Sequence, residues 1–240
     1  MQTATYVALS RQSVLGQAMD VIANNLANMS TTGFKSEEPL FQEYLQPSPA
    51  KGQTISYVRD TGVVRDARQG DLSTTGNPLD IGIDGNGYFQ VNTVDGPRYT
   101  RNGRFQIDSG RNLVTAQGYQ VLNATGQPIT IPQGATSILI GTDGSVATET
   151  GPIGKIALTS FANQQDLVAA GNGLYATSAN PIPDTVSTMH QGTLEASNVQ
   201  PIVAMTQMLE IQRSYTSAQN IIEGEDTRIK NAIDKLSKSA

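Results

Sequence analysis

The chain has 240 residues, a formal net charge of −5 and no cysteine. Because nucleic-acid binding needs a basic surface that neutralises phosphates, this acidic balance argues against a nucleic-acid partner. Without cysteine the chain has no disulfide, no thiolate metal site and no thiol nucleophile. A chain of this length forms one domain or two and has enough residues to bury a real core.

The first predicted element is a helix from Thr3 to Asn28, which no proline interrupts. Its apolar residues lie on one stripe, with spacings of three and four from the second member onward. The stripe consists of Ala8, Leu15, Met19, Ile22 and Leu26, with Met29 just past its end. The segment has no basic start followed by an unbroken apolar run, so we expect neither a cleaved signal peptide nor membrane insertion.

Asparagines crowd the end of this helix, at Asn24, Asn25 and Asn28, and a turn-forming segment follows up to Gly33. Asparagine, serine and threonine compete for backbone hydrogen bonds, and glycine adopts positive φ, so the pattern predicts a helix stop. Three asparagines are more than one cap requires. A plain C-cap is one reading of this pattern, and the alternative that the asparagines have a further role stays open at this point.

Residues 36–71 read as an extended connector. Pro39, Pro47 and Pro49 exclude a long helix there, and glycines interrupt the segment further. Residues 54–64 contain good strand formers and predict short strands.

Residues 72–185 are predicted to form an all-β outer domain of short strands and tight turns. The strands are expected at residues 81–83, 88–91, 98–101, 104–107, 129–131, 138–140 and 153–158. Hairpin turns are expected at Asp84-Gly85, Asp95-Gly96 and Asp143-Gly144, because glycine adopts the positive φ that such turns need.

Residues 186–240 are expected to hold a return segment and then one long helix, from about Asn198 to Leu236. Its apolar seam consists of Ala204, Met208, Ile211, Tyr215, Ala218, Ile222, Ile229 and Leu236. This seam and the stripe in residues 1–35 each need a partner, and pairing with each other buries both. The predicted fold is therefore mainly β with α, in which the central all-β domain is carried on paired, coiled-coil-like terminal helices.

The residues that usually carry chemistry are few. His190 is the only histidine, which excludes a histidine metal cluster, and we read it as a polar strand residue before the last helix. Asp80, Asp84 and Asn86 lack the closing glutamate of a calcium loop. The glycines around Asn86 have no following helix to receive a phosphate. We therefore expect no catalytic, cofactor or metal site, no small-molecule substrate and no enzymatic activity.

Four motifs carry a family resemblance. Residues 23–28 read ANNLAN and residues 31–35 read TTGFK, which resembles the N-terminal motif of bacterial flagellar rod and hook proteins. Residues 194–199, LEASNV, and 208–215, MLEIQRSY, resemble the matching C-terminal motif. Residues 75–80 with 87–89, and 99–103 with 113–115, resemble central motifs of the same family. The resemblance covers nearly the whole chain.

This resemblance implies a structural subunit of the flagellar basal-body rod, within the proximal rod, that polymerises through its terminal helices to build part of the drive shaft. It implies export by the flagellar type III apparatus, a periplasmic location in the basal body, and other rod subunits and copies of itself as partners. The alternatives are a distal rod subunit of the same family, or a β-rich secreted binding module with a helical dimerisation stalk.

The resemblance and the two seams together assign a set of residues to packing within and between subunits. They are Leu15, Met19, Ile22, Asn24, Asn25, Leu26, Asn28, Gly33, Phe34, Asn198, Met208, Ile211, Arg213, Tyr215, Ile222 and Ile229.

Overall fold

The computed structural model describes residues 2–47 and 54–238 and divides into two compact units. The first, called the helical unit here, comprises Met1–Ala27, Glu37–Val64 and Gln200–Ala240. The second, the β-rich unit, comprises Asn28–Ser36 and Arg65–Val199. The segment after the first helix, residues 28–36, therefore lies with the strands rather than with the helices.

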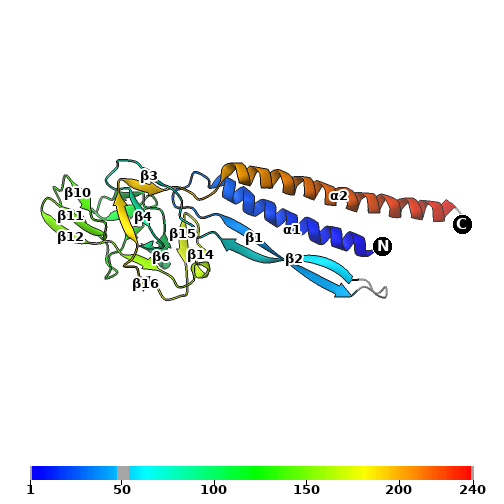
Figure 1. Cartoon of the computed structure of the whole chain (residues 1–240), viewed down its shortest axis with the longest axis horizontal. Coiled ribbons are helices and arrows are strands. Elements are labelled where there is room, and N and C mark those ends of the chain that lie inside the picture. The colour runs from blue at the N-terminus through cyan, green and yellow to red at the C-terminus, as the bar shows by residue number, and fades with distance from the viewer. Residues whose placement is uncertain (1, 48–53, 239–240) are drawn as a thin grey trace. The chain divides into compact units, whose positions relative to one another are not determined.

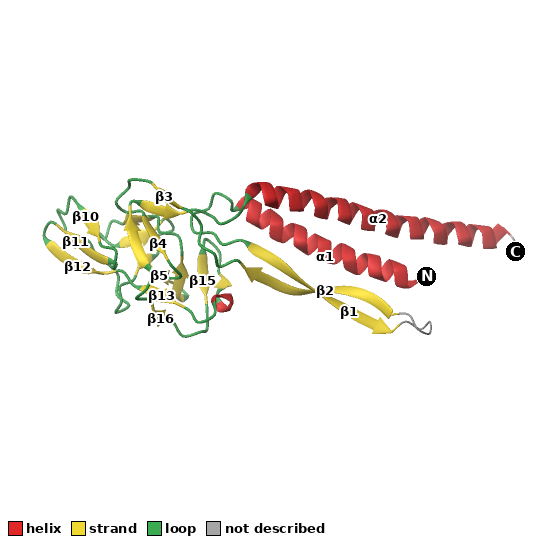
Figure 2. Cartoon of the chain, viewed as in Figure 1, coloured by secondary structure: helices red, strands yellow, loops and turns green. Residues whose placement is uncertain are grey.

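Two helices dominate the helical unit, α1 (Gln2–Ala27) and α2 (Pro201–Lys238), and they lie side by side (Figure 1). Pro201 opens α2, where a proline costs nothing because the first N–H of a helix has no partner within the helix. The predicted mainly β chain with a long helix near each end is confirmed (Figure 2).

The helices pack along a seam that includes several small side chains. Ala8, Ala18, Ala204 and Ala218 are buried, and alanine allows two helix backbones to approach closely. Of the predicted α1 stripe, Ala8 and Ile22 are buried, whereas the larger Leu15, Met19 and Leu26 are half-buried. The fully buried line runs through Val14, Ala18, Ile22 and Asn25. Ile22 belongs to both lines, and the other three each precede a predicted residue by one position.

The helical unit also holds a two-stranded sheet of β1 (Glu37–Pro47) and β2 (Thr54–Arg65). The predicted strand at residues 54–64 is β2. Residues 37–47 form a strand in spite of Pro39, because a two-stranded sheet leaves one edge of each strand without a ladder partner. Pro49 and Gly52 lie outside the described residues.

The β-rich unit contains one large sheet of nine strands in the order β14-β15-β6-β5-β9-β8-β7, with β13 paired to β5 and β16 paired to β13. Its strands are β5 (Tyr88–Thr93), β6 (Gly96–Thr100), β7 (Phe105–Ile107), β8 (Leu113–Thr115), β9 (Gln120–Val121), β13 (Leu158–Ser160), β14 (Val168–Ala169), β15 (Leu174–Ala176) and β16 (Ile182–Pro183). A single turn of 3₁₀ helix, Gln164–Asp166, interrupts the strand pattern.

Three smaller sheets complete the unit. β10 (Ile138–Ile140), β11 (Ser145–Thr148) and β12 (Gly151–Lys155) form an antiparallel meander. The other two are the pairs β4 (Ile81–Asp84) with β17 (Thr188–Gln191), and β3 (Leu72–Thr74) with β18 (Thr193–Glu195). The strands just before α2 therefore pair with the first strands of the unit.

The strand predictions can now be compared with the structure. Strands overlap the predicted positions 81–83, 88–91, 98–101, 104–107 and 138–140. Residues 129–131 contain one isolated bridge, from Thr130 to Asn112, and the strand expected at 153–158 is two strands, β12 and β13.

The turns at Asp95-Gly96 and Asp143-Gly144 join paired strands, as predicted. The prediction of a hairpin at Asp84-Gly85 is wrong. Gly85 has a φ of +122°, as a turn requires, but β4 pairs with β17 rather than with β5.

Two clusters form the core of the β-rich unit. The larger is aliphatic with two phenylalanines, and Phe89 and Phe105 meet edge to face at 5.0 Å. The smaller gathers the aromatic rings of Tyr88, Tyr99, Phe161 and Tyr175. Burial raises the pKa of Tyr88 to about 12, so its phenol stays neutral at physiological pH.

Candidate functional site

The second half of the N-terminal motif, residues 31–35, lies inside the β-rich unit, against residues 194–199 of the C-terminal motif. The Gly33 N–H donates to the Glu195 carbonyl at 2.8 Å, and the Asn198 N–H donates to the Phe34 carbonyl at 3.4 Å. Gly33 has a φ of +68°, and a Cβ at this position would lie 2.6 Å from the backbone carbon of Arg101. Only glycine therefore fits there without a shift of the backbone.

A buried ion cluster joins three distant parts of the sequence. The Glu195 carboxylate lies 2.6 Å from Lys35 Nζ and 2.7 Å from an Arg101 guanidinium nitrogen, and the three side chains are at most 2% exposed. The Gly70 N–H also donates to Glu195, at 3.0 Å. Burial lowers the pKa of Lys35, and the adjacent Glu195 carboxylate partly offsets this effect.

Backbone carbonyls satisfy the remaining donors of this cluster. Lys35 Nζ donates to the Arg68 carbonyl at 2.8 Å, and Arg101 Nη1 donates to the carbonyl of Gly85 at 2.9 Å and to that of Gly87. Removing one partner of such a cluster would leave a charge buried without compensation. The cluster therefore fixes Lys35, residues 68–70, Arg101 and Glu195 to one another.

Two of the predicted asparagines bind backbone as a neighbouring strand would. Asn25 donates to the Glu37 carbonyl at 2.7 Å and accepts from the Glu37 N–H at 2.9 Å, within the helical unit. Asn198 accepts from the Ser36 N–H at 2.7 Å and donates to the carbonyls of Asp66 and Arg68, each at 3.0 Å, within the β-rich unit. Asn25 therefore does more than cap α1.

By exposure, the predicted packing residues other than Asn25 fall into three groups. Ile22 and Gly33 are buried. The half-buried residues are Leu15, Met19, Leu26, Asn28, Phe34, Asn198, Met208, Ile211, Tyr215 and Ile222. Asn24, Arg213 and Ile229 are exposed.

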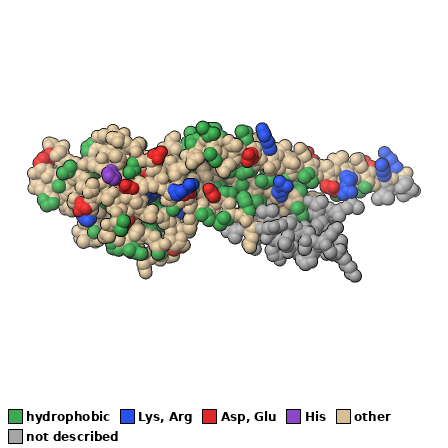
Figure 3. All heavy atoms as spheres, viewed as in Figure 1, with side chains coloured by type: hydrophobic (Ala, Val, Ile, Leu, Met, Phe, Trp, Pro, Cys, Tyr) green, Lys and Arg blue, Asp and Glu red, His purple; other side chains and the backbone are tan. Residues whose placement is uncertain are grey.

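A second apolar stripe covers part of α2 on the side away from α1. Ile202, Met205 and Leu209 are 81%, 48% and 55% exposed, and their spacing of three and four residues places them on one helix face. On the α1 surface Tyr6 and Leu9 are likewise exposed. Figure 3 shows hydrophobic side chains gathered over the helices on the face drawn. The helical unit therefore keeps apolar side chains in solvent after its own seam is closed.

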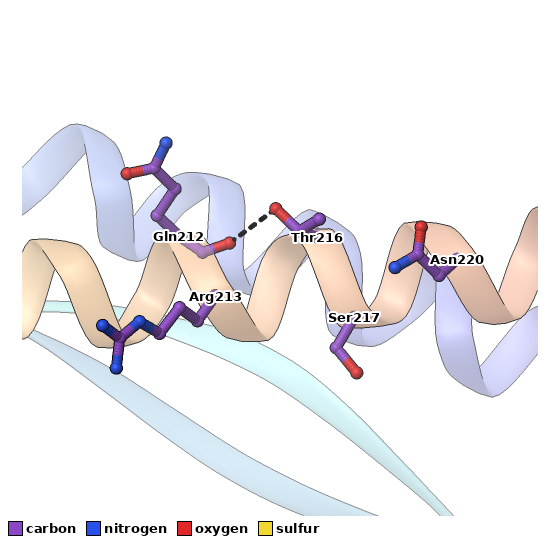
Figure 4. A pocket seen from close by; sticks show the side chains of 5 residues that line it. All are labelled: Gln212, Arg213, Thr216, Ser217 and Asn220. Atoms are coloured by element: carbon purple, nitrogen blue, oxygen red, sulfur yellow. Dashed lines mark hydrogen bonds between the residues drawn. The ribbon is translucent and has the colours of Figure 1, made fainter.

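The hollow on α2 has no features of a catalytic pocket. Its lining residues are Gln212, Arg213, Thr216, Ser217 and Asn220 (Figure 4). All five come from one face of a single helix, and the hydrogen bond drawn, from Thr216 to the Gln212 carbonyl at 2.9 Å, is internal to that helix. No groups converge on a reacting atom there.

A cavity of about 480 Å³ in the β-rich unit has an apolar floor that includes Ile156, Leu158 and Met189. Asp184, on its rim, accepts hydrogen bonds from the N–H groups of Val186 and Ser187 at 2.9 and 3.0 Å and caps the turn there. The Ser187 hydroxyl also donates to Asp184 Oδ2 at 2.5 Å, so these polar groups at the cavity satisfy one another.

Within the described ranges, His, Cys, Asp and Glu nowhere gather in threes that could hold a metal ion. A search of the same residues finds no helix that is both long and apolar enough to span a membrane.

Sequence reasoning placed Lys35, Arg101 and Glu195 within family motifs but assigned them no role. The sequence offered one signal that such a charge is buried. A charged residue stands between residue types that are often buried, as in Leu194-Glu195-Ala196. Similarly, Val14 and Ala18 were missed because the bulkier Leu15 and Met19 stood beside them with the same spacing.

Family models match the three parts of the chain that build these features. A model described as flagella basal body rod protein matches residues 6–35, and one for the flagellar hook protein FlgE/F/G D1 domain matches residues 82–148. A third, for the C-terminal region of flagellar basal body rod FlgEFG proteins, matches residues 190–235.

Whole-chain relatives agree with these matches. The chain is 39% identical over 244 residues to the flagellar basal-body rod protein FlgF of Caulobacter vibrioides, which covers 99% of each chain. It is 34% identical to FlgF of Rhizobium meliloti over 100% of both chains. To the rod protein FlgG of Bacillus subtilis it is 33% identical, over 98% of this chain and 99% of the relative. The chain therefore belongs to the family of flagellar basal-body rod proteins.

Proposed function

We propose that this chain is a structural subunit of the proximal flagellar rod and that it polymerises through its helical unit. The observation that carries the proposal is the apolar stripe of Ile202, Met205 and Leu209, which stays exposed on α2 after the seam with α1 is closed. An exposed stripe of this spacing is suited to packing against another helix. The role is mechanical and needs no catalytic group.

The proposed partners are copies of this chain and other proximal and distal rod subunits. The chain reaches the basal body through the flagellar type III export apparatus, without a cleaved signal peptide. A proximal position is favoured because the chain is more similar to the FlgF of Caulobacter vibrioides, at 39% identity, than to the FlgG of Bacillus subtilis, at 33%. The distal rod is the second candidate, supported by the FlgG of Bacillus subtilis.

We further propose how the predicted packing residues divide between the two kinds of contact. Leu15, Met19, Ile22, Leu26, Met208, Ile211, Tyr215 and Ile222 stabilise the seam within one subunit, where they are buried or half-buried. Asn25, Gly33 and Asn198 hold backbone within the chain through their hydrogen bonds. Asn24, Arg213 and Ile229 are exposed and contact neighbouring subunits, and Asn28 and Phe34 stabilise the turn after α1.

Deleting the gene and purifying basal bodies tests this function. We expect cells that do not swim and basal bodies with an incomplete rod, and both defects should be corrected by a plasmid copy. Immunogold labelling of an epitope in the complemented strain should lie between the inner-membrane ring and the distal rod. Intact rods in the deletion strain, or label beneath the outer rings, would overturn the proximal assignment.

A further inference from the structure

The sequence contains three Asn-Gly pairs, Asn86-Gly87, Asn102-Gly103 and Asn172-Gly173. In such a pair the main-chain nitrogen of glycine can bond to the side-chain carbonyl carbon of asparagine, and the amide then leaves as ammonia together with the glycine N–H proton. Water opens the resulting cyclic imide at either carbonyl and gives aspartate or isoaspartate. The reaction needs a free glycine nitrogen and an asparagine side chain that can rotate toward it, so the fold decides which pair reacts.

The fold holds two of these pairs. In the first pair the Gly87 N–H donates to the Ser187 hydroxyl at 3.1 Å, and Gly87 is buried. In the second pair the side-chain oxygen of Asn102 accepts from the Arg104 N–H at 3.0 Å, and Gly103 is buried. Each of these pairs can react only after a local opening that frees the nitrogen or the side chain, and the small population of the open state slows the reaction.

The third pair lies in the exposed turn between the paired strands β14 and β15 (Figure 1). Asn172 and Gly173 have φ values of +53° and +71°, as the two central residues of a type I′ turn require. The Leu174 N–H donates to the Gly171 carbonyl at 2.9 Å and closes the turn around them. Among the described residues, neither the Asn172 side chain nor the Gly173 N–H has a hydrogen-bond partner. Both conditions for the reaction are therefore met in the folded chain.

We propose that Asn172 deamidates spontaneously in the folded protein and that its isoaspartate form releases β14 from the sheet. Isoaspartate routes the main chain through the side-chain carbon, which adds one methylene to the turn. Because turn length sets how two strands pair, the bond from the Ala170 N–H to the Leu174 carbonyl, at 2.8 Å, is lost. β14 has two residues and lies at the edge of the sheet, so it separates, whereas β15 also pairs with β6 and stays.

Peptide mapping by mass spectrometry tests the site in full-length protein kept at mildly alkaline pH, once folded and once in denaturing urea. In urea the three pairs should react at comparable rates, because each offers the same unhindered glycine nitrogen. In the folded protein Asn172 should react at least about tenfold faster than Asn86 and Asn102, which need a local opening. Asn172→Gly keeps a residue that adopts positive φ but has no side-chain amide, so this variant should lose most of the acidic products that the folded protein accumulates.

Hydrogen exchange on the separated products tests the release of β14. The isoaspartate form should lose protection at the Ala170 amide, whereas Asn172→Asp, which adds the same charge to an unchanged main chain, should keep it because aspartate tolerates positive φ. Two outcomes would overturn the inference. They are reaction of Asn86 or Asn102 as fast as Asn172 in the folded protein, and an isoaspartate form in which Ala170 stays protected. Neither outcome bears on assembly, so the gene-deletion experiment judges the proposed function separately.

Discussion

Replacing Glu195 with alanine is expected to destabilise the β-rich unit by about 3–5 kcal/mol, because it leaves two buried cations without their anion. Lys35 and Arg101 both contact this carboxylate, at 2.6 and 2.7 Å, and each of these side chains is only 2% exposed to solvent. A domain whose total stability is about 5–15 kcal/mol loses a large fraction of it by this one change.

Urea unfolding followed by tyrosine fluorescence measures this loss, since Tyr88, Tyr99 and Tyr175 lie in the core of the same unit. The matched control is Lys155→Ala, which removes an exposed pair with Asp143 at 3.6 Å. Exposed pairs contribute about 0–1 kcal/mol, so the control should unfold close to the unmodified protein. Equal midpoints for the two variants would show that the cluster does not hold the motifs together.

Ala218→Asp is expected to open the helix pair while the β-rich unit stays folded. Ala218 is 3% exposed in the seam, and an aspartate there places a carboxylate in a packed interface at a cost of several kcal/mol. Helices with one apolar face gain most of their stability from packing, so separation also removes helical order.

Hydrogen exchange in the full chain measures the separation of the two helices residue by residue. Amides of residues 8–22 and 204–222 should lose protection in Ala218→Asp, whereas amides of β5 and β6 should keep it. Ser217→Asp is the control, because Ser217 is the exposed neighbour of Ala218 on the same helix. Retained protection of both helices in Ala218→Asp would mean that the seam is not what stabilises them.

The elements that depend on local sequence were predictable. Both long helices follow from apolar spacing and from the absence of internal proline, and the turn at Asp143-Gly144 follows from the positive φ that Gly144 adopts. Strand β1 was not predicted, because the prolines of residues 36–49 were used only to exclude a helix, and a proline such as Pro39 is tolerated in a sheet of two strands.

The features that depend on distant partners were not predictable. Gly82 pairs with His190 across the sequence, so local turn chemistry at Asp84-Gly85 could not reveal that β4 lacks a hairpin partner. Lys35 and Glu195 are 160 residues apart. The sequence shows that a motif contains a charged residue, but only the folded structure shows which opposite charge that residue pairs with.

Incorporation of Leu209→Asp into basal bodies tests most directly whether the exposed helical surface builds the rod. Leu209 is 55% exposed and outside the seam, so the variant should fold and be exported normally, as exposed substitutions usually change stability by about 0.5 kcal/mol or less. Asn220→Asp, also exposed on α2, is the matched control. Quantitative mass spectrometry of purified basal bodies should find Leu209→Asp at less than about a tenth of the Asn220→Asp level, in cells that do not swim. Equal incorporation and normal swimming would contradict assembly through the helical unit.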